Sequence, residues 1–158
     1  MKRPFSFSVP CGRFPKQVEL WSRDGERLSV VADLPLAETI PIAHGSCRTG
    51  RRSLSFRPDQ PATLYWVEAQ DGGDGAREAN PRDVVYMATC DELAAGAEPR
   101  PLLETELRYG GIGWGAADFA MLYESWYDTR QERTWTFNPQ EARPQKQILF
   151  DRNSDDSY

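Results

Sequence analysis

The stretch at residues 108–137 most constrains how this chain can fold. It contains three apolar or alternating runs, at 112–114, 119–126 and 134–137, which are separated by short polar turns. Runs of this length between turn residues are typical of β-strands. Three strands within about thirty residues leave no room for the crossover helix that parallel strands need. The stretch therefore predicts an antiparallel meander, in which we expect the strand at 119–126 to be buried on both faces.

The same pattern occurs once before in the chain. Residues 52–56, 63–68 and 83–87 predict three strands, again separated by turn-forming segments. A further run closes each copy, at 101–107 in the first and at 146–151 in the second. Four antiparallel strands that repeat at roughly 45–55 residues are typical of the blades of a β-propeller.

The remaining segments fit around these two units. The turn signal Asp24-Gly25 between two short apolar runs predicts a hairpin, which would be half of a preceding blade. We also expect a helical turn at 36–39. The predicted fold is therefore all-β, a partial β-propeller of about two four-stranded antiparallel blades plus a preceding hairpin. Its expected parts are an irregular lead-in (1–16), the hairpin of an incomplete blade (17–34), a connection (35–51), two blades (52–107 and 108–151) and a polar tail (152–158).

Composition argues against two classes of partner. The 158 residues carry a net charge of −5, whereas a nucleic-acid-binding domain usually presents a basic face. No apolar run approaches the ~20 residues that span a bilayer. Lys2 and Arg3 are not followed by an apolar segment, so no signal peptide is expected. We therefore expect neither nucleic acid nor a membrane as a partner.

The cysteines and one acidic loop carry no clear metal signal. Cys11, Cys47 and Cys90 are far apart and form no Cys-x-x-Cys pair, so free thiols in a reducing compartment are the preferred interpretation. The loop DGGDG at 71–75 places carboxylates beside glycines, but it lacks the ligand spacing of an EF-hand. We interpret it as a solvated hairpin loop. No metal and no cofactor are expected.

Several long segments are similar to one protein family. They lie at 4–21, 33–43, 63–74, 80–87, 107–114, 122–135 and 148–156. Together they resemble the β-propeller of the prolyl oligopeptidase family, in the glutamyl endopeptidase branch of chloroplasts and cyanobacteria. The resemblance implies a serine peptidase that cleaves after acidic residues, chiefly Glu. It also implies that an N-terminal propeller gates a C-terminal α/β-hydrolase domain, which carries a Ser-Asp-His triad.

The sequence contains no counterpart of that triad. A Gly-x-Ser-x-Gly nucleophile elbow is absent, and the only histidine, His44, lies in a loop of the propeller part. His44 and Ser46 lack the strand–elbow–helix context, so we interpret His44 as an ordinary loop histidine. Since Met1 falls inside the family's propeller, we expect this chain to be a segment of a longer protein. The segment itself is expected to carry no catalytic residue. The alternative is a non-enzymatic propeller-like interaction module that oligomerises to complete its ring.

Basic and aromatic residues are expected to gather on one face. In a four-stranded blade, the start of the first strand and the loop between the second and third strands lie at the same end. The residues at these positions, candidates for a substrate-facing or interdomain face, are Arg48, Arg51, Arg52, Arg108, Tyr109, Trp126, Tyr127, Arg130 and Arg133. Guanidinium groups bind carboxylates through two hydrogen bonds, so this face would attract acidic peptides. For any single arginine, the preferred alternative is a salt bridge to an acidic residue of the same loops, which are Glu68, Asp71, Glu124 and Asp128.

The resemblance also implies the partners. They are the C-terminal α/β-hydrolase domain, the remaining propeller blades and peptide substrates with acidic residues. The expected location is the cytoplasm, or the plastid stroma for a plant-type source. We interpret Trp66, Trp114 and Trp135 as packing residues between blades. An open arc of blades leaves strand edges unpaired, so we expect the isolated chain to self-associate or to unfold in part.

Overall fold

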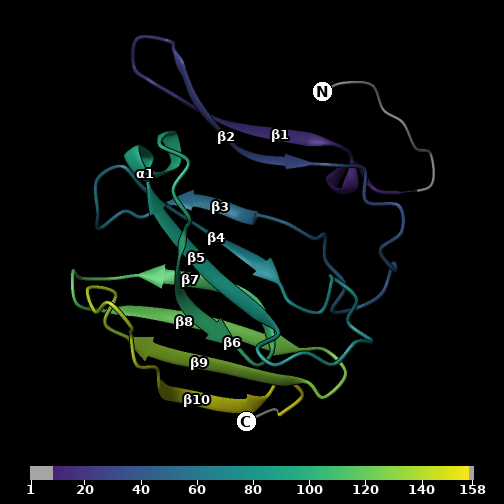
Figure 1. Cartoon of the computed structure of the whole chain (residues 1–158). Helices are drawn as coiled ribbons and strands as arrows, with labels where there is room; N and C mark the ends of the chain where they lie inside the picture. The colour runs from purple at the N-terminus through teal and green to yellow at the C-terminus, as the bar shows by residue number, and fades with distance from the viewer. Residues whose placement is uncertain (1–8, 157–158) are drawn as a thin grey trace.

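The computed structural model describes residues 9–156, which form ten strands and two short helices (Figure 1). The elements are η1 (Cys11–Arg13), β1 (Lys16–Trp21), β2 (Arg27–Leu34), β3 (Arg52–Phe56), β4 (Thr63–Ala69), β5 (Asp83–Thr89), α1 (Cys90–Ala94), β6 (Arg100–Thr105), β7 (Arg108–Trp114), β8 (Ala120–Trp126), β9 (Gln131–Phe137) and β10 (Gln147–Asn153). None of the helices in residues 9–156 is long and apolar enough to cross a membrane.

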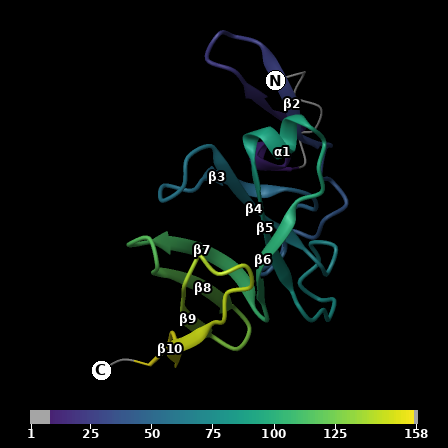
Figure 2. The same ribbon diagram turned by 60° about the vertical axis from the view of Figure 1, so that its left-hand side comes forward.

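The strands form three antiparallel sheets, in each of which strands that are consecutive in the sequence pair with each other. A β1–β2 hairpin precedes a sheet with the order β3-β4-β5-β6, which is followed by a sheet with the order β7-β8-β9-β10. Figures 1 and 2 show these three units stacked in chain order, with the hairpin at one end and β10 at the other. The predicted fold class is confirmed: an all-β chain with a hairpin ahead of two four-stranded antiparallel sheets.

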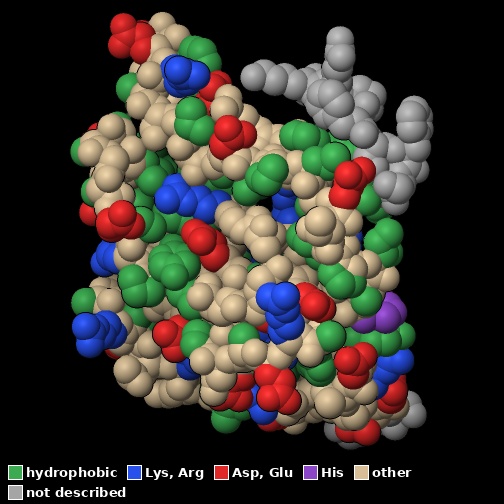
Figure 3. Space-filling model, turned by 45° about the vertical axis from the view of Figure 1, so that its right-hand side comes forward, with side chains coloured by type: hydrophobic (Ala, Val, Ile, Leu, Met, Phe, Trp, Pro, Cys, Tyr) green, Lys and Arg blue, Asp and Glu red, His purple; other side chains and the backbone are tan. Residues whose placement is uncertain are grey.

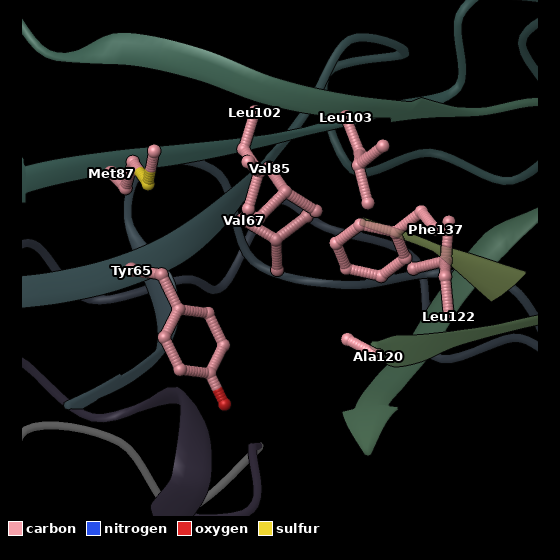
Figure 4. Close-up of a cluster of buried hydrophobic side chains, with 9 residues drawn as sticks. All are labelled: Tyr65, Val67, Val85, Met87, Leu102, Leu103, Ala120, Leu122 and Phe137. Carbon is pink, nitrogen blue, oxygen red and sulfur yellow. The ribbon is translucent and has the colours of Figure 1, made fainter. Parts of the chain in front are cut away.

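The main hydrophobic core lies between the two four-stranded sheets. Figure 4 shows side chains of β4, β5 and β6 that point toward side chains of β8 and β9. Val67, Val85 and Leu122 are fully buried in this cluster. Burying an aliphatic side chain of this size stabilises a fold by roughly 1.5–3 kcal/mol, so these contacts fix how one sheet lies on the other.

A second core joins the hairpin to the β3–β6 sheet. Trp66 is fully buried there, together with Leu20 of β1 and Val31 of β2. Since Trp66 and Val67 are neighbours on β4, this strand is buried on both faces. The β3–β6 sheet thus receives the hairpin on one face and the next sheet on the other. Trp114 and Trp135 pack against the main core, in agreement with the interpretation of the tryptophans as packing residues.

The prediction that β8 is buried on both faces is wrong. Ala120, Leu122 and Glu124 are buried, but Tyr123 and Ser125 are exposed. Double-sided burial needs a sheet on each side, as β4 has, and the described residues place a sheet on only one side of β8. The apolar composition of the run therefore predicted more burial than this strand has.

The connection between the hairpin and β3 also differs from expectation. Residues 36–39 form no helical turn and run as irregular chain. Ala37 is held by its backbone N–H, which donates to the carbonyl of Arg13 at 3.0 Å, and it is buried together with Ile40. The segment is thus shaped by packing against the N-terminal turn rather than by local helix propensity. β10 also reaches Asn153, two residues beyond the expected strand end.

Candidate functional site

Two buried aspartates organise the end of the sheets where the basic face was predicted. Asp71 follows β4 and Asp83 begins β5, and both side chains are inaccessible to solvent. Arg52 Nη2 lies 2.7 Å from Asp83 Oδ1, and Arg108 Nη1 lies 2.8 Å from the same oxygen. Arg82 Nη1 donates to Asp71 Oδ2 at 2.8 Å, and Arg108 also pairs with Asp71. We call these five residues the arginine–aspartate network.

The network is anchored to the backbone of three segments. The N–H of Tyr109 donates to Asp83 Oδ2 at 2.7 Å, and the N–H of Gly73 donates to Asp71 Oδ1 at 2.9 Å. Arg108 Nε donates to the carbonyl of Gly45 at 2.8 Å. The network therefore ties the 35–51 connection and the β3–β6 sheet to the first strand of the next sheet.

The network holds three guanidinium groups against two carboxylates, which leaves an excess of positive charge. Burial by itself raises the pKa of Asp71, but hydrogen bonds from Arg108 and Gly73 outweigh it, so the pKa of this carboxyl lies below its ordinary value. Burial likewise raises the pKa of the nearby Cys47 thiol, which favours its neutral form. Nε of Arg52 is buried and has no hydrogen-bond partner among residues 9–156.

Aromatic rings and cations cover the same end of the molecule. The guanidinium of Arg82 lies 4.0 Å from the ring centre of Trp126. The ring of Tyr127 stacks on His44 at 3.4 Å, and the guanidinium of Arg130 lies 3.8 Å from the centre of the same ring. Two groups this close to the centre of one ring would collide if they lay on the same face. The Tyr127 ring therefore lies between the imidazole of His44 on one face and the guanidinium of Arg130 on the other. Figure 3 shows the histidine at the surface, beside hydrophobic and basic side chains.

The predicted face residues thus separate into three groups. Arg52, Arg108 and Tyr109 belong to the network, whereas Trp126, Tyr127 and Arg130 form the aromatic cover. The other three belong to neither group and make contacts elsewhere in the fold. They are Arg48, Arg51 and Arg133.

These three arginines are engaged within the fold. Arg48 donates to the carbonyls of Gly12, Phe14 and Pro35 at 3.0, 3.2 and 2.6 Å. Arg51 donates to the carbonyl of Val31 at 2.8 Å and lies over the ring of Trp66. Arg133 pairs with Asp151 of β10 at 3.0 Å, within its own sheet, and with Glu106 at 2.6 Å, in the link between β6 and β7.

The salt-bridge alternative describes several of these contacts. Glu68 lies 3.8 Å from Arg51, Glu124 lies 3.9 Å from Arg133, and Asp71 pairs with Arg82 and Arg108. Arg130 instead pairs with Asp155 at 3.6 Å, and Asp128 has no ion pair in the described part of the chain. Sequence reasoning missed Asp83, which it assigned to the start of a strand, and Arg82, to which it gave no role.

The interpretation of 71–75 as a solvated loop is wrong for Asp71. This carboxylate is buried and accepts hydrogen bonds from Gly73, Arg82 and Arg108. Nearby, Cβ of any other residue at position 73 would lie 2.0 Å from the carbonyl oxygen of Cys47, so the loop closes directly on the 35–51 connection. Within residues 9–156 no three His, Cys, Asp or Glu side chains are grouped as a metal site.

His44 and Ser46 do not form a catalytic pair. His44 stacks on Tyr127, and Ser46 Oγ is buried without a hydrogen-bond partner among the described residues. The cysteines are free, with Cys11 exposed and Cys47 and Cys90 partly buried. A cavity of about 370 Å³ lies between the 35–51 connection and the β4–β5 loop, and Arg48 and Arg77 are among its lining residues.

Comparison with known proteins gives a consistent result. The chain is 53% identical over 156 residues, 99% of its length, to the rice (Oryza sativa subsp. japonica) protein named probable glutamyl endopeptidase, chloroplastic. It is 53% identical over 158 residues, 100% of its length, to the Arabidopsis thaliana protein of the same name. The chain spans 16% of the length of each relative.

No protein-family model matches the chain. No solved structure matches it either. The resemblance to glutamyl endopeptidases inferred from the sequence motifs is nevertheless confirmed by the two relatives, since the similarity extends over 99% and 100% of the chain. Over nearly its whole length, this chain is therefore similar to one segment of the glutamyl endopeptidases of chloroplasts.

Proposed function

We propose that this chain is a propeller segment of a serine endopeptidase similar to glutamyl endopeptidase, and that it gates the access of peptides to a hydrolase domain outside the chain. The observation that carries the proposal is 53% identity along the whole chain to two proteins with that name. The order of a hairpin and two four-stranded meanders supports it, because consecutive propeller blades have this organisation.

The geometry suggests how the segment would act. The arginine–aspartate network locks the two sheets together at one end, so it would hold a rigid wall beside the peptide path. Among the paired arginines of the predicted face, Arg130 has the most exposed side chain and is the most available to an acidic peptide. Its side chain is 37% exposed, and its partner Asp155 is 73% exposed at a distance of 3.6 Å. Exposed ion pairs of this kind are weak, so a peptide carboxylate can replace Asp155.

In this proposal the partners are the C-terminal α/β-hydrolase domain, the remaining blades and peptide substrates with acidic residues. The names of the relatives place those proteins in chloroplasts, which supports the plastid stroma as the location for a plant-type source. For another source, the proposed location is the cytoplasm.

A chimera tests the proposal. This chain replaces the matched segment of the rice relative, and hydrolysis is measured on an unstructured Glu-containing peptide and on the same sequence inside a folded domain. We expect cleavage of the free peptide and protection of the folded substrate. A folded chimera without hydrolysis would contradict the peptidase proposal and favour the non-enzymatic interaction module. Equal cleavage of both substrates would contradict gating.

Substitutions in the chimera test the role of the basic face. We expect Arg130→Gln to raise KM several-fold for peptides with acidic flanking residues and to leave peptides with neutral flanks unaffected. The matched control is Arg27→Gln, since Arg27 is also exposed and paired with a carboxylate, that of Glu19 at 3.1 Å, but lies on the hairpin. Equal effects of the two substitutions would rule out a specific contribution of Arg130.

A further inference from the structure

The cavity of about 370 Å³ between the 35–51 connection and the β4–β5 loop has walls that are fixed by hydrogen bonds. The N–H of Cys47 donates to the carbonyl of Gly73 at 2.9 Å, which joins the two segments directly. The N–H of Ala37 donates to the carbonyl of Arg13 at 3.0 Å, which holds the start of the connection. Both walls are therefore internal parts of the chain, and a volume of this size is typical of a small-molecule site.

Arg48 brings a positive charge to this cavity that no carboxylate balances. Its guanidinium donates to the carbonyls of Gly12, Phe14 and Pro35, but it makes no ion pair within residues 9–156. Carbonyl oxygens carry only partial charges, so they satisfy N–H groups without neutralising the cation. Burial lowers the pKa of Arg48 below its ordinary value, and no carboxylate of the described residues offsets this shift.

A second cation reaches the same cavity from the β4–β5 loop. Arg77 Nε lies 3.8 Å from Asp74 Oδ2, and the Arg77 side chain is 71% exposed, so this ion pair is weak. Asp74 also lines the cavity, which thus has two cations against one carboxylate among its described lining residues. The part of the lining that the connection supplies is largely apolar and includes Leu36, Ile40 and Pro41.

We propose that this cavity binds a carboxylate that is carried on a short aliphatic chain. Arg77 can hold a carboxylate through two parallel hydrogen bonds, and Arg48 has one N–H of Nη2 left beyond its bonds to the three carbonyls. The apolar wall covers the methylene groups next to the carboxylate. An inorganic anion would leave that wall without a contact, so the lining favours an organic acid.

Two sources carry this chemistry, a free dicarboxylate and the side chain of a glutamate in a peptide. The described lining residues all lie outside the arginine–aspartate network and the aromatic cover. The proposal therefore does not depend on the proposed peptidase function.

Isothermal titration calorimetry of the whole chain tests the proposal with glutarate, the blocked peptide Ac-Ala-Glu-Ala-NH2, its Gln counterpart and inorganic phosphate. We expect glutarate or the Glu peptide to bind at least tenfold more tightly than phosphate and the Gln peptide. Tighter binding of glutarate would identify a free acid as the ligand, and tighter binding of the Glu peptide would identify an acidic residue of a polypeptide. Binding of neither, or equal binding of phosphate, would overturn the proposal.

A substitution and a spectrum locate the site. Arg77→Gln should weaken binding at least fivefold, and the matched control is Arg27→Gln, since Arg27 is also exposed and lies 3.1 Å from Glu19 on the hairpin. Amide chemical shifts, which need no variant, should change on addition of the ligand at 35–41, 48–49 and 72–77. Equal weakening by Arg27→Gln, or shift changes confined to other segments, would contradict the assignment to this cavity.

Discussion

Replacing Asp83 by alanine removes the carboxylate that two guanidinium groups share. The Asp83 side chain is inaccessible to solvent, and those of Arg52 and Arg108 are only 13% and 12% exposed. The N–H of Tyr109 also loses its acceptor, which lies at 2.7 Å. Arg108 retains Asp71, but Arg52 has no other ion pair in the described residues. The variant therefore leaves one cation and one backbone donor buried without compensation.

The expected loss of stability is large. Removing one partner of a buried ion pair typically costs ~3–5 kcal/mol, because the remaining charge stays desolvated. A domain of ordinary size is stable by only ~5–15 kcal/mol, so the loss is a substantial fraction of the total. The matched control is Asp74→Ala, whose carboxylate lies 3.8 Å from the largely exposed Arg77. A surface pair contributes about 0–1 kcal/mol, so the control should lose little.

Urea unfolding, followed by tryptophan fluorescence, measures both variants. With an m-value of ~1–3 kcal/mol per molar urea, the Asp83→Ala midpoint should fall by more than about 1 M relative to the unmodified chain. The Asp74→Ala midpoint should stay close to that of the unmodified chain. If the two midpoints move equally, or if 1 M salt removes the effect of Asp83→Ala as it would for a screened surface charge, the reasoning from a buried network is refuted.

Four further outcomes are expected. Trp66→Ala should cost ~3–5 kcal/mol in urea unfolding because the ring is fully buried, whereas Trp21→Ala, 54% exposed, should cost far less. Gly73→Ala should lower the melting temperature, since φ is +79° and Cβ would lie 2.0 Å from the carbonyl oxygen of Cys47. Hydrogen bonds and neighbouring cations hold the pKa of Asp71 low despite its burial, so its contribution is complete above the unfolded carboxyl pKa of ~3.9 and is lost as pH falls through the folded value; Asp71→Asn should flatten acid unfolding below about pH 4. A fluorophosphonate probe should label no serine of the chain, and stoichiometric labelling of one serine would contradict the absence of a catalytic triad.

The strands could be predicted because their signals are local. Turn residues and apolar runs delimit each strand of the two meanders, so their order follows from the sequence alone. Helix α1 was missed although Thr89 and Glu92 have the spacing of a capping box, and both capping hydrogen bonds are present. Burial was harder to predict: β4 and β8 have similar composition, but only β4 has a packed neighbour on both faces.

The site could be predicted only in part. The antiparallel topology places the start of each first strand beside the loop between the second and third, so the positions of Arg52 and Arg108 at one end follow from the sequence. Their shared partner does not, because Asp83 meets Arg108 only where the β7–β10 sheet lies against the β3–β6 sheet. The angle between two sheets depends on the volume of the core side chains, which no local pattern specifies.

Four arginines of this chain act across the junctions between its stacked units: Arg51, Arg57, Arg82 and Arg108. Five cations lie over aromatic rings in the described residues. Arg51 joins the hairpin to the β3–β6 sheet through Val31 and Trp66. Arg57, 2% exposed, lies over Trp114 of the next sheet.

Substituting a junction arginine therefore breaks packing and hydrogen bonds together, and any loss of peptide hydrolysis would reflect a loss of fold. Arg130 differs, because its side chain is 37% exposed and its partner Asp155 is 73% exposed. Removing Arg130 therefore leaves no buried carboxylate without a partner. A change in KM without a change in unfolding midpoint is expected there, and Arg130 is consequently the position at which peptide binding can be measured separately from stability.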